Sequence, residues 1–525
     1  MGNGPVDALG LALGVVACAL AALRWLRVAQ REHYLAGAAV RFARRWWSAG
    51  LANPAVAAAG TAGAIVSVWY PFAGFAAVLA AGAGPIGLGL RGRTSRLAWT
   101  GRLRRLACLL GLLVAVAVGA SAAATAAVAT TAGLHGGFSA AVFCAMAMPL
   151  LADAALWAAR PAESRLLEPY LEQARRRLVA VAPRIVAITG SYGKTTTKGY
   201  VAHLLAGSFS VVATPASFNN AAGLARSVNE QLSSGTQVFV AEMGTYGPGE
   251  IRAMCAWAAP EVSVITAIGP VHLERMGSLG RIAEAKAEIL EGARAVVLNV
   301  EYPLLAELAA KAGTEGKLVW RCSSGSVPAD VEAVPEGGKL RVRAPRCTAE
   351  MDLLVAVAPE VDPGNVACAV ATALSLGVPV PTVAARLADL PGAPHRRSPQ
   401  TGANGAGIVD DTYNANPAGA AAALALLGGL GASGGRRVVV TPGMVELGAA
   451  QALENANFAA RAGAVATEMV VVGRTNAAPL LAGARAAGLA TRQVRDRPAA
   501  VRWVSANLGP GDAVLYENDL PDHYP

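Results

Sequence analysis

Cysteine is scarce and scattered in this sequence. The seven cysteines lie far apart, no two of them form a C-x-x-C pair, and none has a histidine nearby at the spacing of metal ligands. This pattern excludes a disulfide framework and the common zinc-binding arrangements. We expect the cysteines to be buried thiols of a protein whose chemistry lies in a reducing compartment.

Lysine is also rare, and no nucleic-acid-binding motif is present. Only six of the 45 basic residues are lysines, and many of the arginines stand between apolar stretches near the N-terminus. The net charge of +10 therefore indicates membrane topology and contact with anionic lipid. We expect no nucleic-acid partner.

Apolar residues, by contrast, are abundant. The hydrophobic fraction is 54% and the mean hydropathy is +0.42, with the excess in the first 160 residues. A cleaved signal peptide is disfavoured, because Met1–Asp7 has no basic residue and apolar segments recur. We predict a transmembrane domain of about five helices over 1–160, with the lipid bilayer as a partner. The five stretches are Val6–Leu23, Leu51–Phe72, Ala73–Leu90, Leu106–Leu134 and Phe138–Ala159.

The positions of the arginines predict the orientation of these spans. Arginines are concentrated in the loops that contain Arg24–Arg45 and Arg91–Arg105, whereas the turns at 69–74 and 133–137 carry no basic residue except a histidine. Loops rich in arginine and lysine stay on the cytoplasmic side of a membrane. We therefore expect a multi-pass protein whose N-terminus is outside and whose residues after Arg160 are cytoplasmic.

The rest of the chain alternates between strand-like and helix-like segments, which is typical of α/β domains with parallel sheets. Residues 161–184 are charged with a helical apolar period, and predict an amphipathic linker at the membrane surface; an ordinary first helix is the alternative. Residues 185–390 predict a central α/β domain. A break at Pro391–Pro394 separates it from a second α/β domain over 391–525.

One segment carries the strongest chemical signal. Residues 186–198 read Val-Ala-Ile-Thr-Gly-Ser-Tyr-Gly-Lys-Thr-Thr-Thr-Lys, a strand followed by a glycine turn and a helix start. Such a loop directs backbone N–H groups at phosphate, with Lys194 at the β and γ oxygens and Thr195 at a magnesium ion. Ile188 stands where the first glycine of the standard pattern would be. A chance glycine turn is the alternative.

That loop resembles the ATP loop of the Mur ligases, and further segments resemble the same family in the same order over 184–525. The likeness is nearest to MurF, which adds D-alanyl-D-alanine to a UDP-muramoyl tripeptide. The segments are Thr214–Asn220, Glu242–Glu250, His272–Ser278, Glu284–Ile289, Asp410–Pro417 and Met444–Gly448. The resemblance implies a P-loop central domain, a Rossmann-like C-terminal domain, and ATP and Mg²⁺ as cofactors.

The resemblance also implies roles for individual residues. Magnesium is held by Thr195, Glu242, His272 and Lys286, with Lys286 carbamylated, and Lys194, His272, Lys286 and Asp411 are assigned to catalysis. The expected ATP-binding residues are Gly190, Ser191, Gly193, Lys194, Thr195, Thr196, Asn220, Asn299, Arg396, Asp411 and Asn414. The alternatives are a capping role for Glu242, a structural His272, a solvated helix lysine at Lys286 and a plain Asn/Pro turn at 410–417.

Three functions follow from these patterns. The first is a ligase at the bacterial inner membrane that activates a carboxylate as an acyl phosphate and joins it to an amino acid or dipeptide amine in peptidoglycan precursor synthesis. Its acceptor is a muramoyl peptide on UDP or on lipid. The second is a membrane-bound poly-γ-glutamate-type synthase, and the third is a membrane scaffold without activity. Against the family pattern, the Lys-Gly-Ser ending is replaced by Glu517-Asn-Asp and Asn455 stands where histidine is expected.

Overall fold

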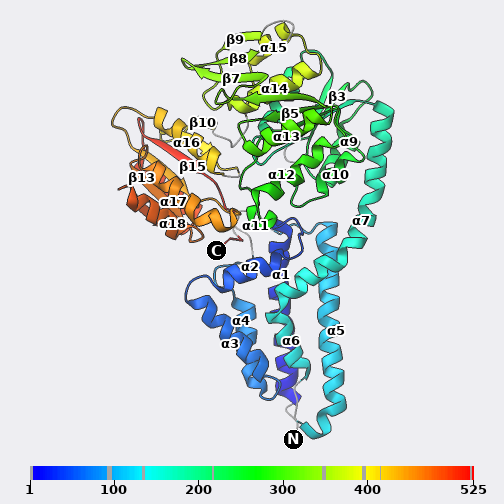
Figure 1. Cartoon of the computed structure of the whole chain (residues 1–525). Coiled ribbons are helices and arrows are strands. Elements are labelled where there is room, and N and C mark those ends of the chain that lie inside the picture. The colour runs from blue at the N-terminus through cyan, green and yellow to red at the C-terminus, as the bar shows by residue number, and fades with distance from the viewer. Residues whose placement is uncertain are drawn as a thin grey trace. The chain divides into compact units, whose positions relative to one another are not determined.

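The computed structural model describes residues 4–90, 97–132, 136–215, 218–345, 351–392, 398–413, 416–520 and 523–524 (Figure 1). The chain divides into two units. The helical unit comprises Met1–Leu166 and Leu520–Pro525, and the α/β unit comprises Leu167–Asp519.

Apolar helices build the helical unit. They are α1 (Gly4–Arg31), α2 (Ala38–Trp47), α3 (Ala52–Val66), α4 (Pro71–Ala83), α5 (Gly101–Ala132), α6 (Gly136–Met146) and the first half of α7 (Met148–Val181). In the described part of the chain, two helices, α1 and α5, are long and apolar enough to cross a membrane, and up to four spans result if α2–α3 and α6–α7 each count as one bent span. The prediction of five spans is not matched, because α3 and α4 form a hairpin of 15 and 13 residues.

Small residues bring the helices of this unit close together. A Cβ on Gly63 of α3 would lie 2.6 Å from the carbonyl oxygen of Ala73, and one on Gly60 would lie 2.5 Å from the Ala80 Cβ of α4. Ala77 and Ala80 are buried, whereas Phe72 and Leu79 on the same helix are 71% exposed. Large side chains therefore point outward and small ones inward.

The six residues 520–525 belong to the helical unit, and their described members pack on α2. His523 is buried and its Nε2 lies 3.0 Å from a carboxylate oxygen of Glu32, while the Trp46 indole donates to the His523 carbonyl at 2.8 Å. The Phe42 ring contacts the rings of His523 and Tyr524. A short aromatic segment thus completes the packing around α2.

The predicted surface linker at 161–184 is wrong as a separate element, because α7 continues without a break to Val181. Ala174 and Leu178 are buried in the core of the α/β unit, with Leu171 packed against them. The apolar face of this helix therefore packs against the protein core and not against a membrane surface, which agrees with the alternative of an ordinary first helix.

The central part of the α/β unit is a nine-stranded sheet. The strand order is β2-β3-β1-β4-β5-β6-β7-β8-β9, parallel from β2 to β7 and antiparallel from there. The strands are β1 (Arg184–Thr189), β2 (Val211–Ala213), β3 (Val238–Glu242), β4 (Val262–Ile265), β5 (Ala295–Asn299), β6 (Leu318–Ser323), β7 (Val331–Glu336), β8 (Lys339–Ala344) and β9 (Met351–Val355). Strand order changes direction at β1, where ligands bind in such sheets.

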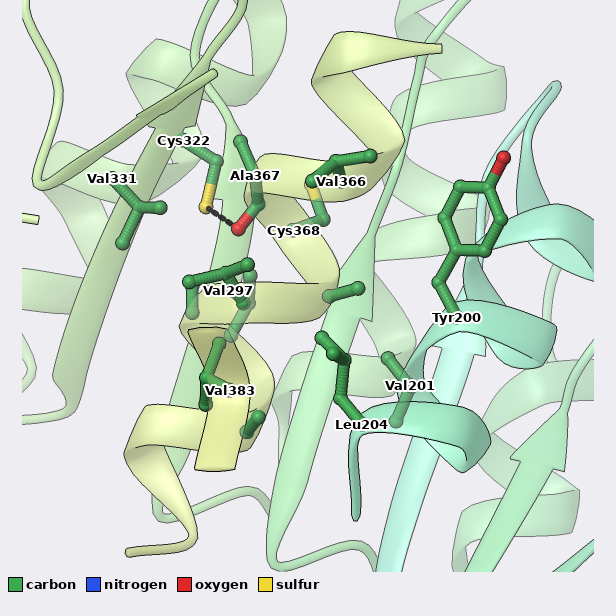
Figure 2. Close-up of a cluster of buried hydrophobic side chains, with 14 of the residues drawn as sticks. Tyr200, Val201, Leu204, Val297, Cys322, Val331, Val366, Ala367, Cys368 and Val383 are labelled. Atoms are coloured by element: carbon green, nitrogen blue, oxygen red, sulfur yellow. Dashed lines mark hydrogen bonds between the residues drawn. The ribbon is translucent and has the colours of Figure 1, made fainter. Parts of the chain in front are cut away.

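Helices cover both faces of this sheet. They are α8 (Lys194–Leu205), α9 (Ala221–Gln231), α10 (Glu250–Cys255), α11 (Leu273–Met276), α12 (Leu279–Ala287), α13 (Pro303–Thr314), α14 (Pro363–Ser375) and α15 (Val380–Leu387). On one face, Val201 and Leu204 of α8 and Val366 of α14 pack towards Val297 of β5, and the Cys322 thiol of β6 lies 3.6 Å from the Ala367 carbonyl (Figure 2). This core fixes the starts of α8 and α14.

A second sheet, of six strands, forms the C-terminal part of the α/β unit. Its order is β10-β11-β15-β12-β13-β14, parallel except for β10. The strands are β10 (Ser398–Thr401), β11 (Gly407–Asp411), β12 (Arg437–Thr441), β13 (Glu468–Val472), β14 (Ala490–Val494) and β15 (Ala513–Glu517), and the helices are α16 (Pro417–Gly429), α17 (Gln451–Ala462), α18 (Ala477–Ala486) and α19 (Arg497–Asn507). Asp411, Thr441 and Glu517 end adjacent strands and meet at one edge.

The cysteines only partly match the prediction of buried thiols. Four are buried, at Cys18, Cys144, Cys322 and Cys368, and all six described cysteines are free. Cys108 is exposed, because it stands on α5, whose apolar stretch is largely uncovered by other helices. Cys255 is partly exposed and Cys347 lies outside the described residues.

Candidate active site

The predicted phosphate loop lies between β1 and α8, and its glycines are sterically required. Gly193 caps α8 with φ +77°, and a Cβ there would lie 2.3 Å from Oδ1 of Asn365. Gly190 has φ +155°, and its Cβ would lie 2.0 Å from the Thr266 hydroxyl. A side chain at either position would displace the loop, since both the backbone and the space favour glycine.

Hydrogen bonds tie this loop to the loop that follows β4. The Ser191 amide donates to the Ala267 carbonyl at 2.8 Å, and the Gly269 amide donates to the Ser191 hydroxyl at 2.9 Å. The Tyr192 ring covers Gly269, where a Cβ would lie within bonding distance of its hydroxyl. The segment 266–269, which leads to His272, is thus held against the phosphate loop.

The lysines of the loop have different partners. Lys194, the first residue of α8, donates to the Gly190 carbonyl at 2.8 Å. Lys198, one turn later, is buried and lies 3.0 Å from Oε2 of Glu242 at the end of β3. Oε1 of Glu242 accepts from Asn219 at 3.1 Å. The Lys198–Glu242 ion pair was not predicted, although both residues stand in the motifs.

Glu242 is almost fully buried, and its surroundings favour the ionised form. Burial acts to raise its pKa, but the ammonium groups of Lys198 and Lys194 and the Asn219 amide outweigh that effect, so the pKa lies below its usual value. Among the described residues, neither side-chain oxygen accepts a hydrogen bond from the backbone of a helix terminus. Glu242 therefore presents a buried negative charge beside the phosphate loop, and the capping alternative is wrong.

Lys286 on α12 is buried, with 5% of its surface exposed. Removal from water lowers the pKa of its amine well below the usual value, and the nearby Lys194 charge lowers it further. The alternative of a solvated helix lysine is therefore wrong. Burial therefore disfavours the charged form of this amine.

His272 begins α11 in the left-handed conformation, with φ +58°. Its Nδ1 is hydrogen-bonded to Oε2 of Glu446, which stands in the loop after β12. Arg275 donates to the other oxygen of Glu446 at 3.2 Å. The sequence motifs around His272 and Glu446 were both singled out, but their contact across 174 residues was not predicted.

A cleft of about 700 Å³, including its open mouth, is lined by four of the predicted nucleotide-binding residues. It is lined by Gly193 and Thr196 of the phosphate loop, by Asn299 at the end of β5 and by Asp411 at the end of β11. Sequence reasoning did not single out four further lining residues, which are Tyr192, Tyr302, Asp362 and Asn365; Asp362 caps α14 ahead of Pro363, a local signal that was available.

Other predicted residues lie elsewhere or cannot be placed. Asn220 caps α9 by accepting from the Gly223 amide, and its neighbour Asn219 contacts Glu242 instead. Arg396 and Asn414 lie outside the described residues. Asn416 lines the cleft together with Tyr413 and also caps α16, so this turn does more than end a strand.

The donor groups fit a magnesium ion that arrives with ATP. Within the described ranges, no group of three or more His, Cys, Asp or Glu side chains is arranged to hold a metal ion. Magnesium in nucleotide sites is held by one or two carboxylates together with phosphate oxygens and water. An ionised Glu242 beside the phosphate loop supplies one such carboxylate, and Thr195 and His272 are the further predicted ligands.

Comparison with known families agrees with this geometry. Residues 188–373 match the Mur ligase middle domain, and residues 395–516 match the Mur ligase glutamate ligase domain. The helical unit lies outside both matches.

Individual relatives and solved structures point the same way. UDP-N-acetylmuramoyl-tripeptide--D-alanyl-D-alanine ligase of Mycobacterium tuberculosis H37Rv is 33% identical over 362 residues, covering 65% of this chain and 71% of that protein. The enzyme of the same name from Escherichia coli K12 is 29% identical and covers 51% and 60%. In fold, the α/β unit is similar to MurF of Thermotoga maritima in complex with ADP, with a TM-score of 0.56 at 24% identity over 67% and 80% of the chains. The chain belongs to the Mur ligase family of ATP-dependent amide ligases and is MurF-like.

Proposed function

We propose that this protein is a membrane-anchored ligase that uses ATP to join an amine to a carboxylate of a peptidoglycan precursor. The observation that carries the proposal is the cleft, because it gathers the phosphate loop, Asn299 and the Asp411 turn around one space. Residues from both sheets line it, so ATP bound there contacts both parts of the α/β unit.

The chemistry assigned to the cleft needs two steps. A carboxylate oxygen of the acceptor attacks the γ-phosphorus of ATP, ADP leaves, and an acyl phosphate forms. The amine then attacks the carbonyl carbon and phosphate leaves, which completes the amide. Lys194 holds phosphate oxygens, and a magnesium ion near Glu242 offsets their charge.

We extend the proposal to Lys286 as a carbamate. Its buried position and lowered pKa favour the neutral amine. The amine nitrogen attacks the carbon of carbon dioxide, and the nitrogen then loses a proton. The product is an anion that places an oxygen ligand further from the backbone than a glutamate would. Such a group supplies the second carboxylate-like ligand of the site.

The proposed membrane location is supported by the surface of the helical unit. Trp69, Tyr70 and Phe72 are exposed together at the turn between α3 and α4, as aromatic residues are at membrane interfaces. Only 11% of the apolar window of α5 is buried. The hairpin α3–α4 begins and ends on the same side of the proposed membrane, whether or not both helices cross it fully. The prediction that the α/β unit is cytoplasmic is therefore the same in either case.

The test is product formation by the purified full chain in lipid nanodiscs. UDP-linked muramoyl tripeptide and its lipid-linked counterpart are the acceptor arms, and D-alanyl-D-alanine, D-alanine and glutamate are the amine arms. We expect phosphate release that requires both an acceptor and an amine, with the amide product detected by mass spectrometry. Polymer formation with glutamate alone would instead support the poly-γ-glutamate-type function. ATP hydrolysis in no arm would contradict the proposal and favour a scaffold.

A further inference from the structure

Glu446 and His272 bring the two sheets of the α/β unit into contact next to the phosphate loop. Besides the side-chain hydrogen bond, the Glu274 amide donates to the Glu446 carbonyl at 3.3 Å. Both bridging residues have left-handed backbones, with φ +58° at His272 and +65° at Glu446. Non-glycine residues seldom adopt this conformation and keep it only where their surroundings hold them in it.

Neighbouring side chains fix the geometry of this contact. The Arg275 guanidinium lies 3.2 Å from the second oxygen of Glu446 and is stacked 5.0 Å above the Tyr246 ring. The Tyr246 ring in turn meets the His272 ring edge-on, with 5.0 Å between centroids. Gly448, two residues after Glu446, has φ +57°, a left-handed backbone that glycine adopts without steric cost.

The path of the chain places His272 close to the site of phosphate binding. Gly269 is hydrogen-bonded to Ser191 of the phosphate loop, and His272 follows three residues later, within about 11 Å of chain. The ring therefore belongs to the central sheet, whereas the carboxylate that contacts it comes from the C-terminal sheet.

We propose that Glu446 is a positioning residue for the magnesium site, acting through His272; this rests on the proposed function and on His272 as a metal ligand. An ionised carboxylate only accepts hydrogen bonds, so the proton of a neutral His272 ring lies on Nδ1 and the lone pair lies on Nε2. A histidine ligand is ordinarily oriented in this way by a carboxylate on its other nitrogen. Here that carboxylate comes from the other sheet, so the metal site is complete only when the two sheets are together.

The test compares Glu446→Ala, Glu446→Gln and the exposed control Glu307→Gln in the full chain. Mn²⁺ binding in the presence of ADP is followed by electron paramagnetic resonance, and the His272 ring nitrogens are followed by ¹⁵N NMR. The protein has only six histidines, so the signal is assigned by its loss in His272→Gln. Phosphate release is measured against Mg²⁺ concentration in the same samples.

We expect Glu446→Ala to weaken Mn²⁺ binding about 10-fold or more and to shift the His272 ring signals, as loss of such partners does. Glu446→Gln keeps an acceptor and should fall between Ala and wild type, while Glu307→Gln should match wild type. Unchanged Mn²⁺ affinity or unchanged ring signals in Glu446→Ala would overturn the proposal. Wild-type protein that turns over ATP yet binds no Mn²⁺ would also overturn it, whereas absence of both would count against the proposed function. If Glu446→Ala does not fold, Glu446→Gln decides by the same readouts.

Discussion

The helical unit and the α/β unit differ in how many large apolar side chains they leave exposed. In the helical unit, alanines such as Ala17, Ala77 and Ala80 are buried, whereas Leu51 is 95% exposed and Trp157 69%. In the α/β unit, valine, leucine and isoleucine fill both faces of the sheets. Of the 26 large apolar residues that are exposed in the described ranges, 18 belong to the helical unit and 8 to the α/β unit.

The proposed membrane location accounts for this difference. Water drives large apolar side chains inward, but lipid does not, and helices in lipid approach one another through small residues. Around the phosphate loop, the α/β unit buries three ionisable side chains, Lys198, Glu242 and Lys286. Buried charges are costly, so their presence around one loop marks the place where the chemistry is expected.

The largest expected effect tests whether the chemistry belongs to the α/β unit alone. Lys194→Ala removes the phosphate contact and should reduce ATP turnover at least about 10³-fold, since such contacts act in the transition state. Unfolding midpoints should move little, because Lys194 fills no core volume. Lys311→Ala, an exposed lysine of α13, is the control. Near-normal phosphate release by Lys194→Ala would contradict the ATP assignment.

The next effect concerns the buried amine of Lys286. Lys286→Met keeps the chain length without the amine, so folding should persist while turnover falls by about 10²-fold or more. Lys286→Glu, or Lys286→Ala with added short carboxylic acids, should recover part of the activity by restoring an anion. Lys286→Arg should recover none. Full activity in Lys286→Arg, measured by phosphate release, rules out the carbamate.

A third change addresses the small-residue packing of the helical unit. Gly63→Leu places a side chain against the backbone of α4 and should destabilise the hairpin by about 1–3 kcal/mol, with ATP turnover largely kept. The control Gly119→Leu adds the same residue on α5, where a Cβ has no neighbour within 4 Å among the described atoms. The measurement is the thermal unfolding midpoint in nanodiscs. Equal midpoints for both variants would contradict close packing of α3 on α4.

A fourth prediction concerns a pH dependence inside the α/β unit. Burial and, less strongly, the neighbouring Asp411 charge raise the pKa of Glu517 from 4.5 to about 8, although a hydrogen bond from Thr441 acts to lower it. Between those values the folded protein keeps a proton that the unfolded chain releases, so wild-type stability falls as pH rises, by up to about 1.4 kcal/mol per unit, and levels off above pH 8. Glu517→Gln has no such proton. Its stability relative to wild type, from unfolding midpoints, should rise between pH 5 and pH 8, and parallel curves would refute the buried acid.

Local pattern predicted most of the α/β unit and the part of the site that is local in sequence. The glycines at 190 and 193, the strand ends at Glu242, Asn299 and Asp411, and the start of α8 follow from a strand-turn-helix pattern, and the structure has them. What failed depends on neighbours distant in sequence. The Lys198–Glu242 and His272–Glu446 contacts join separate motifs, and a helical period does not tell which solvent covers its apolar face, as α7 illustrates.

The number of membrane spans could not be predicted from the sequence either. The apolar residues of two short helices in a hairpin have the same composition as two full spans. Asn518 shows a similar limit. Its φ is +62° and its side chain donates to the Gly443 carbonyl, which stabilises a turn that the sequence alone did not indicate.

The central claim is that the α/β unit forms an amide bond at the expense of ATP while the helical unit holds it at a membrane. The most direct measurement is the stoichiometry of ADP, phosphate and amide product made by the full chain in nanodiscs with a muramoyl tripeptide acceptor and D-alanyl-D-alanine. The account predicts one of each per turnover, lost together in Lys194→Ala. Phosphate release without any amide, under every combination of acceptor and amine, would contradict it.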